Sequence, residues 1–190
     1  MEKSRSDSIH IGNQVWMTSN LDVTSFRNGE PIPQVQDLRQ WVLQDAAAMC
    51  NYEGVQNYCQ RFGYLYNWHA VNDSRGLAPE GWRIPDEEDW KILIDFLGGD
   101  YSAVSSLKEK GNDSAKSDYS GSNSRFSALP GGIRSMYGDF RFFDTQACFW
   151  SRSLHDRRFA KIFGLNYSAN NVHFGSAPLR SALSVRCIKE

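Results

Sequence analysis

The chain has 190 residues, a formal net charge of −1 and a hydrophobic content of 41%, ordinary values for a globular protein of one domain or at most two small ones. The balanced charge excludes a bulk attraction to nucleic acid or to an anionic membrane surface, and no apolar run approaches the roughly 20 residues that span a bilayer. The first residues lack the apolar core of a signal peptide. We therefore expect a cytoplasmic or phage-borne protein, or one whose leader is absent from this chain.

The first third of the chain predicts a strand pair, loops and a short helix. Residues 10–23, HIGNQVWMTSNLDV, contain a Gly-Asn turn followed by a short apolar run, which is typical of a hairpin. Residues 37–50 fit a helix or irregular structure equally well. A second helix is predicted over residues 63–71, because apolar residues recur there at near-helical intervals. These residues are Phe62, Leu65, Tyr66 and Ala70.

The clearest element is a helix over residues 87–97. Asp86 occupies the N-cap position and Asp89 follows three residues later, which is the spacing of a capping box. A Gly-Gly pair at residues 98–99 provides a stop. The core-facing stripe consists of Trp90, Leu93, Ile94 and Leu97.

The second half of the chain predicts strands. Residues 108–125 are polar and rich in Ser, Gly and Asp, so we expect a long surface loop there. Short apolar runs separated by turn residues follow at 126–132, 140–144, 148–153, 159–168, 171–175 and 183–190. Gly131-Gly132 predicts a tight approach or a bulge, and Trp150 is expected in the core. Helices followed by antiparallel strands predict an α+β fold.

No motif in the sequence predicts catalysis. The nucleophile elbow, the P-loop and the dinucleotide-binding glycine pattern are absent. Ser151, His155 and Asp156 lie too close together along one strand and loop to form a triad easily. The acidic run at residues 86–89 fits helix capping better than paired catalytic carboxylates, and His69 fits a packed aromatic better than a ligand. We therefore expect no catalytic residue, no metal ion and no cofactor.

The four cysteines predict two different environments. Cys50 and Cys59 bracket a short loop, so they can form a local disulfide in an oxidising compartment. Cys148 and Cys187 lie in apolar strands and are expected to be buried thiols. The spacings of cysteine and histidine do not match those of a structural zinc site.

Several stretches together resemble a known family. They are IGNQVWMTSNLDV, FRNGEPIP, YLYNWHAVNDSRGLAPEGWRIPDEEDW, LIDFLGG, FSALPGGIRS, FWSRS and SVRC, in this order. From Ile9 to Lys189 the chain resembles the Fibrobacter succinogenes major paralogous domain family of bacterial surface and secreted proteins. That family resembles the C-type lectin fold, in the branch that includes formylglycine-generating enzymes. The resemblance implies a single domain over residues 1–190, with two helices packed on a twisted antiparallel sheet and termini close together.

The chain departs from the family pattern after Trp150. Family members usually carry Asn, Ser and Tyr in this segment, whereas this chain carries Arg, Lys, His, Leu and Phe on an unchanged strand frame. Such a pattern resembles the variable proteins of diversity-generating retroelements. The resemblance implies a ligand-binding face made of Arg152, Leu154, His155, Arg157, Arg158, Lys161, Phe163, His173, Phe174, Leu179 and Arg180.

The functional expectation is a non-catalytic module that recognises a protein or glycan ligand on a cell surface, without nucleic acid binding and without membrane insertion. It would be extracellular, displayed on a bacterial surface, or part of a phage particle. One alternative is an enzyme related to the formylglycine-generating branch, which uses a reactive cysteine pair; Cys187 and Cys148 are the candidates here. The other alternative is a structural or adhesive surface protein.

Overall fold

The computed structural model of the protein describes residues 7–55, 57–108 and 126–190. The strands in these residues are β1 Ser8–Ile11, β2 Gln14–Met17, β3 Met49–Cys50, β4 Leu65–Asn67, β5 Trp82–Arg83, β6 Gly131–Arg134, β7 Phe140–Phe143, β8 Gln146–Leu154, β9 Phe159–Asn166, β10 Asn171–Pro178, β11 Ala182–Leu183 and β12 Ile188–Lys189. The helices are α1 Leu38–Val42, α2 Tyr58–Phe62, α3 Trp68–Val71, α4 Glu87–Phe96 and α5 Asp100–Leu107, with a 3-10 turn, η1, at Tyr52–Gly54.

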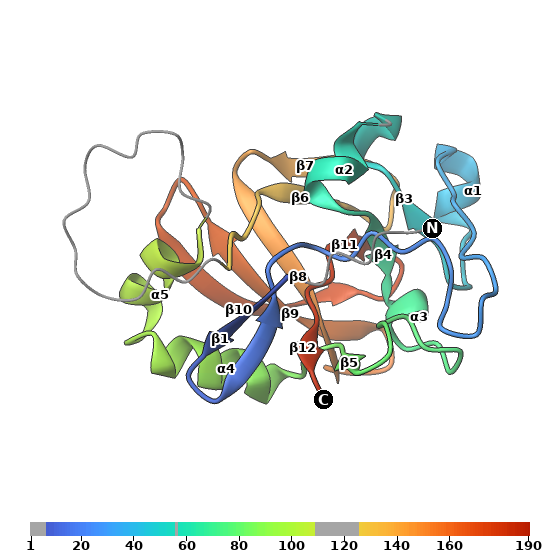
Figure 1. Ribbon diagram of the computed structural model, residues 1–190. Helices are drawn as coiled ribbons and strands as arrows, with labels where there is room; N and C mark the ends of the chain where they lie inside the picture. The colour runs from blue at the N-terminus through green and yellow to red at the C-terminus, as the bar shows by residue number, and fades with distance from the viewer. Residues whose placement is uncertain (1–6, 56, 109–125) are drawn as a thin grey trace.

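The strands form three antiparallel sheets (Figure 1). Their orders are β1-β2-β12-β5, β10-β9-β8 and β3-β4-β11-β6-β7. The predicted hairpin at the start of the chain is present as β1 and β2. Ile188 of the last strand pairs with Trp16 of β2 and with Arg83 of β5, so elements near the two ends of the chain lie side by side, as the resemblance implied.

The expected fold class is wrong. An α+β domain of C-type lectin type, with two helices packed on one twisted antiparallel sheet, would divide the chain into a helical first half and a stranded second half. Instead the described residues are mostly strand and turn, arranged in three sheets, with small helices between them. Strands β1 to β5 lie in the half of the chain where helices were expected to dominate.

The predicted helix over residues 63–71 shows why. Gly63 has a left-handed φ of 72° and ends α2, after which β4 pairs with β3 and β11. Only the last four residues of the predicted span form a helix, α3. Phe62, Leu65 and Tyr66 are all buried whether they lie in helix or strand. When a segment is buried on every side, its apolar residues do not recur at a helical or a strand spacing. The spacing therefore does not distinguish a helix from a strand.

The predicted helix over residues 87–97 is confirmed as α4. Asp86 and Asp89 form a reciprocal capping box, in which each side chain accepts a hydrogen bond from the other residue's backbone N–H. The helix ends before Gly98-Gly99, as predicted, but Gly99 is also the N-cap position of α5, which the sequence analysis missed. The polar loop predicted at 108–125 lies outside the described residues, apart from Lys108.

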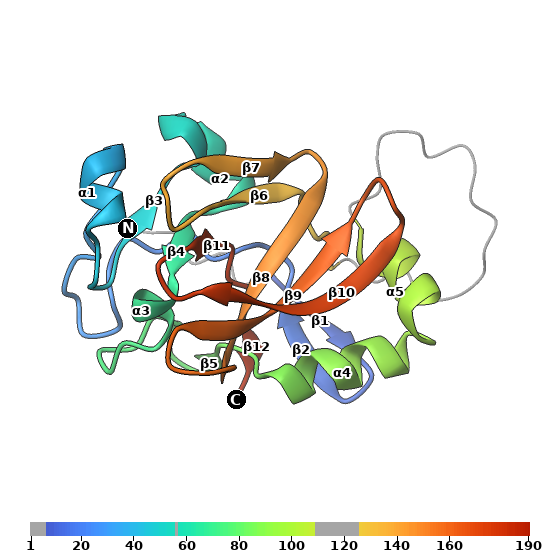
Figure 2. The ribbon, with the colours of Figure 1, turned by 180° about the vertical axis from the view of Figure 1, so that it is seen from behind.

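The core confirms both predicted tryptophan anchors. Trp90 and Trp150 are each fully buried. Trp90 lies on α4 and packs over β8 and β9, stacking on Phe163 with ring centroids 4.5 Å apart. Trp150 donates a hydrogen bond of 2.7 Å from its indole N–H to the carbonyl oxygen of Tyr66. Figure 2 shows α4 on one side of the β8–β9–β10 sheet and β6 and β7 on the other.

The predicted tight approach at the glycine pair is also confirmed. Gly132 has a φ of 64°, and a Cβ atom there would lie 2.4 Å from the carbonyl oxygen of Arg141 on β7. Phe142, which faces Gly132 between the pairs Gly131–Phe143 and Ile133–Arg141, also has a left-handed φ of 65°. A bulky residue in this conformation is unusual and strained. Strand β7 is therefore not regularly extended along its length.

Candidate ligand-binding cavity

The predicted binding residues fall into separate places. One group stays together on the hairpin that joins β8 to β9, and all of its members are exposed: Arg152, Leu154, His155, Arg157 and Arg158. The strand pairing shifts register between Trp150 and Leu154. Within this irregular stretch, Arg152 donates its backbone N–H to Pro85 at 2.9 Å, and Ser153 accepts from Glu87 at 3.1 Å. These bonds anchor the hairpin to the start of α4.

Three predicted residues lie on the side of the sheet that faces α4. Phe163 is fully buried against Trp90, so it belongs to the core and offers no surface to a ligand. Lys161 lies 3.7 Å from Glu87 of α4. Phe174 is exposed and its ring packs against Phe163, with centroids 5.5 Å apart.

The last three predicted residues are dispersed. Leu179 is half-buried and packs on the core cluster around Trp150. Arg180 donates to the carbonyl oxygen of Val42 at 2.7 Å and lies 3.8 Å from Asp45. His173 lies on the opposite side of the sheet from Phe174 and lines a cavity. The structure therefore does not bring the eleven residues onto one face.

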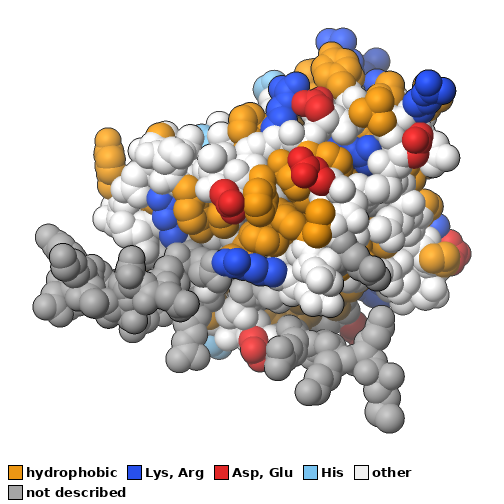
Figure 3. All heavy atoms as spheres, turned by 90° about the horizontal axis from the view of Figure 1, so that it is seen from above, with side chains coloured by type: hydrophobic (Ala, Val, Ile, Leu, Met, Phe, Trp, Pro, Cys, Tyr) orange, Lys and Arg blue, Asp and Glu red, His pale blue; other side chains and the backbone are white. Residues whose placement is uncertain are grey.

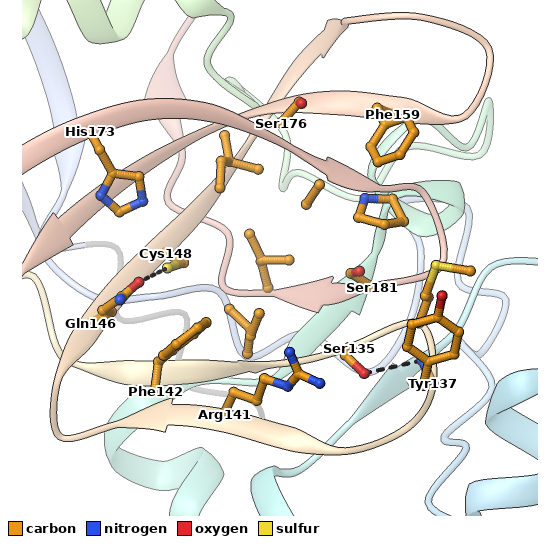
Figure 4. Close-up of a pocket in the computed structure, with 16 residues that line it drawn as sticks. Ser135, Tyr137, Arg141, Phe142, Gln146, Cys148, Phe159, His173, Ser176 and Ser181 are labelled. Carbon is orange, nitrogen blue, oxygen red and sulfur yellow. Dashed lines mark hydrogen bonds between the residues drawn. The ribbon is translucent and has the colours of Figure 1, made fainter.

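The cavity that includes His173 lies between the β8–β9–β10 sheet and the β6–β7 hairpin (Figure 4). Its volume is about 460 Å³, within the range of small-molecule sites. It is lined by Ile133, Ser135, Met136, Tyr137, Arg141, Phe142, Gln146, Cys148, Phe159, Ile162, His173, Ser176, Ala177, Pro178, Ser181 and Leu183.

Aromatic side chains from three segments border the cavity. Phe142 comes from β7, Tyr137 from the turn that connects β6 to β7, and Phe159 from the start of β9. Tyr137 and Phe142 are 67% and 43% exposed, although each could bury well over half its area in a filled core. Beside them, Phe143 points to the other side, where it contacts Tyr52 and Tyr58 with centroids 5.2 and 5.3 Å apart. Figure 3 looks down on the face above α2 and β7, where hydrophobic side chains gather.

A short polar chain runs along the β6–β7 side. Ser135 Oγ and Arg141 Nε both donate to the carboxylate of Asp139. These two hydrogen bonds hold the pKa of Asp139 below its ordinary value. Ser135 Oγ also accepts from the backbone N–H of Tyr137 at 3.1 Å. The carboxylate thus fixes Ser135 and Arg141 in place along the cavity wall.

The sheet side of the cavity carries three further polar groups. Cys148 Sγ donates to Gln146 Oε1 at 3.7 Å, and burial raises the pKa of this thiol to about 12. The imidazole of His173 lies against the backbone of Gly164, where a Cβ atom would be 2.0 Å from its Cε1. Burial lowers the pKa of His173, so the neutral ring, with one donor and one acceptor, is favoured at neutral pH.

The cysteines and the possible metal ligands can be assessed directly in the structure. Within residues 7–55, 57–108 and 126–190, no group of three or more His, Cys, Asp or Glu side chains is arranged to hold a metal ion. None of the four cysteines is in a disulfide, so the proposed Cys50–Cys59 disulfide is not present in the structure. The expectation that Cys148 and Cys187 are buried thiols is confirmed.

Most of the residues that line the cavity were not among the predicted binding residues. Tyr137, Arg141 and Phe142 were not predicted, because aromatic residues in a strand-rich segment normally fill a core. One usable signal was the run FRFF at residues 140–143, since four consecutive large residues on a short strand cannot all point inward. The involvement of His173 with Gln146 and Cys148 depends on strand register, which the sequence does not display.

Comparison with known proteins identifies the family of this chain. No helix in the described part of the chain is long and apolar enough to cross a bilayer. Neither a curated protein nor a solved structure matches the chain. The model of the Fibrobacter succinogenes major domain matches residues 9–189, which span every strand and helix described above except the first residue of β1. The chain therefore belongs to the Fibrobacter succinogenes major domain family.

Proposed function

We propose that this domain is a non-catalytic recognition module that binds its ligand in the cavity between β6–β7 and β8–β10. The observation that carries the proposal is the lining of that cavity. Exposed aromatic rings and polar groups from separate segments converge on one space large enough for a small ligand or part of a larger one. An exposed Phe142 held at a left-handed φ supports the same conclusion, since strained backbone is enriched at binding sites.

The state of the thiols favours binding over catalysis. The enzyme alternative needs a reactive thiolate pair, with Cys148 and Cys187 as its candidates. Burial raises the pKa of each to about 12, so both remain protonated at neutral pH and are poor nucleophiles. The same burial makes them suitable as core residues.

Surface display and variation of the binding region also belong to this proposal. The exposed hairpin from Arg152 to Arg158 can change without disturbing the core, whereas Phe163 cannot. If the hairpin is diversified, near-identical genomic copies of the domain should differ at the hairpin and agree at Phe163. Copies that differ equally at both places would contradict diversification while leaving cavity binding unaffected.

Cavity binding is tested with defined probes and three variants. The probes are a set of neutral and acidic oligosaccharides and short peptides, examined by calorimetry and thermal unfolding. A ligand at 100 times its Kd should add about 2.7 kcal/mol to the free energy of unfolding. Phe142→Ala and His173→Ala should abolish this gain. Tyr101→Ala removes an exposed aromatic side chain on α5 outside the cavity lining and should preserve it.

The variants must themselves remain folded for this test. Phe142 is 43% exposed and His173 half-buried, so near-native circular dichroism and unfolding midpoints are expected for both. If both variants bind every probe as tightly as the unchanged protein does, the cavity is not the binding site.

A further inference from the structure

The hairpin between β8 and β9 concentrates positive charge. Arg152, Arg157 and Arg158 are exposed, and across the described parts of the chain none of them forms an ion pair with a carboxylate within 4 Å. The one acidic residue of the hairpin, Asp156, accepts hydrogen bonds from the backbone N–H groups of Arg158 and Phe159 at 2.7 and 2.9 Å. One oxygen of its carboxylate, Oδ1, accepts both bonds and holds the turn.

This state differs from that of most other arginines in the protein. Arg27, Arg75, Arg83, Arg141 and Arg180 each lie within 4 Å of a carboxylate. Arg134 and Arg186 are buried and donate to backbone carbonyl oxygens. On a chain with a net charge of −1, three exposed arginines beside a single aspartate form a local cationic surface.

The hairpin is continuous with the cavity. Phe159, the residue after Arg158, lines the cavity and pairs with Pro178, which also lines it. The backbone N–H of Leu179 donates to the carbonyl oxygen of Arg158 at 3.0 Å. The cationic hairpin thus begins where the Phe159 end of the cavity stops (Figure 4).

We propose that the cavity and the hairpin together form one extended site for an acidic polysaccharide, with a sugar ring in the cavity and the carboxylate or sulfate groups of adjoining sugars on Arg157 and Arg158. This inference rests on the proposed function, because it requires the cavity to bind. It adds the chemical class of the ligand and a second contact region.

The lining of the cavity matches a sugar ring. A pyranose presents an apolar C–H face, which packs on aromatic rings such as Phe142 and Phe159. It also presents several hydroxyl groups, each able to donate and accept. Gln146 and His173 offer both donors and acceptors in neutral side chains. Beyond the cavity, a guanidinium group matches the geometry of a carboxylate or sulfate, with two parallel hydrogen bonds.

An acidic peptide fits this site less well. Extended peptides commonly bind by adding a strand to an open sheet edge. The edge strands β7 and β10 both border the cavity. The backbone of β7 leaves the extended conformation at Phe142, so a peptide added to that edge would lose the regular ladder of main-chain hydrogen bonds that such binding requires. Addition of an acidic peptide to β10 is the competing outcome, and poly-glutamate is its probe in the test below.

The test is affinity electrophoresis of the full chain in gels that contain one polymer each. The acidic polysaccharides are polygalacturonate, alginate, hyaluronate and heparin; dextran and galactan are the neutral ones, and poly-glutamate is the acidic polypeptide. At least one acidic polysaccharide should retard the protein more than the neutral polymers do. Rising salt should weaken that retardation, because exposed charge pairs are screened.

Two double variants isolate the hairpin. Arg157→Gln with Arg158→Gln should lower affinity for the acidic polysaccharide about tenfold and flatten its salt dependence. Arg39→Gln with Lys189→Gln removes the same charge from exposed positions outside the cavity and the hairpin, and should change affinity by less than about twofold. Phe142→Ala should weaken binding to acidic and neutral saccharides alike.

The outcomes separate this inference from the proposed function. If Phe142→Ala abolishes binding while the hairpin variant binds as tightly as the unchanged protein, the cavity binds a ligand but the hairpin plays no part, and the inference fails alone. If neither variant alters binding, both the inference and the proposed function fail. If the two double variants lower the affinity equally, the effect is one of overall charge, and the hairpin is not a contact region. Stronger retardation by poly-glutamate, or none by any acidic polysaccharide, would also overturn the acidic polysaccharide as ligand.

Discussion

The two faces of the β8–β9–β10 sheet are built from the same strands and have opposite roles. On the face toward α4, one cross-strand row consists of Phe149, Phe163 and Phe174. The adjacent row, on the other face, consists of Cys148, Gly164 and His173. The first row packs against Trp90 and leaves no space, whereas the second borders the cavity.

The difference arises from side-chain volume. Successive residues of a strand point to opposite faces, so each row samples one face only. Where the α4 side has phenylalanine in the middle strand, the cavity side has Gly164. In the next row Ile162 faces Gly175. Small residues at these positions leave space on the cavity side of the sheet, beside a stable core on the other side.

The largest expected effect breaks the packed face. Trp90→Ala should lower the free energy of unfolding by about 3–5 kcal/mol, because it removes the ring that stacks on Phe149 and Phe163. The indole N–H of Trp90 has no hydrogen-bond partner within the described residues, so the loss is one of packing. Denaturant unfolding measures it. Ile92→Ala, at an exposed position of the same helix, should stay within about 0.5 kcal/mol; equal effects would place the core elsewhere.

The next effect concerns the β6–β7 wall of the cavity. Gly132→Ala should lower the free energy of unfolding by about 1–3 kcal/mol, because its left-handed φ is strained for alanine and the new Cβ would lie 2.4 Å from the carbonyl oxygen of Arg141. Gly175→Ala is the control, since its Cβ would meet only Ile162 at 3.6 Å. That change should be neutral or stabilising by up to about 1 kcal/mol. Chemical unfolding of both variants decides between these expectations.

A smaller effect should alter the cavity face alone. Gly164→Ala places a Cβ 2.0 Å from Cε1 of His173, so the imidazole has to rotate, at a cost of about 0.5–1.5 kcal/mol if it leaves its preferred rotamer. The His173 Cε1–H resonance should move while the unfolding midpoint changes little. In the His173→Ala background the same glycine change should cost less, because the two residues are in contact. If the effects of Gly164→Ala and His173→Ala on the free energy of unfolding simply add, the two residues are not in contact.

The smallest effect is a loss of stability in acid. Burial lowers the pKa of His173 from its ordinary value of 6.5. Below 6.5 the unfolded chain therefore binds a proton that the folded chain resists, and the free energy of unfolding falls as the pH falls. Urea unfolding between pH 8 and 5 should show this decline, and His173→Gln should reduce it. His69, whose pKa is also lowered by burial, should supply what remains. A decline that is unchanged in His173→Gln would mean that His173 is not buried.

Local signals in the sequence predicted the elements that depend on neighbours along the chain. The capping box of α4 involves two residues three positions apart, so its geometry follows from the sequence itself. The hairpin group from Arg152 to Arg158 stays together for the same reason. The helix predicted over residues 63–71 failed because β4 is held by β3 and β11, and those strands come from distant parts of the chain.

The sequence by itself determined the family, the helix at Glu87–Phe96, the strand-rich second half and the buried Trp90 and Trp150. Each of these depends on residue types at short, fixed spacings. Only the tertiary structure decided the three-sheet architecture, the burial of Phe163, and the placement of His173 beside Gln146, Cys148 and Phe142. The physical reason is strand register: shifting one pairing by a single residue exchanges the two faces of a strand, and the register is set by contacts between segments far apart in sequence.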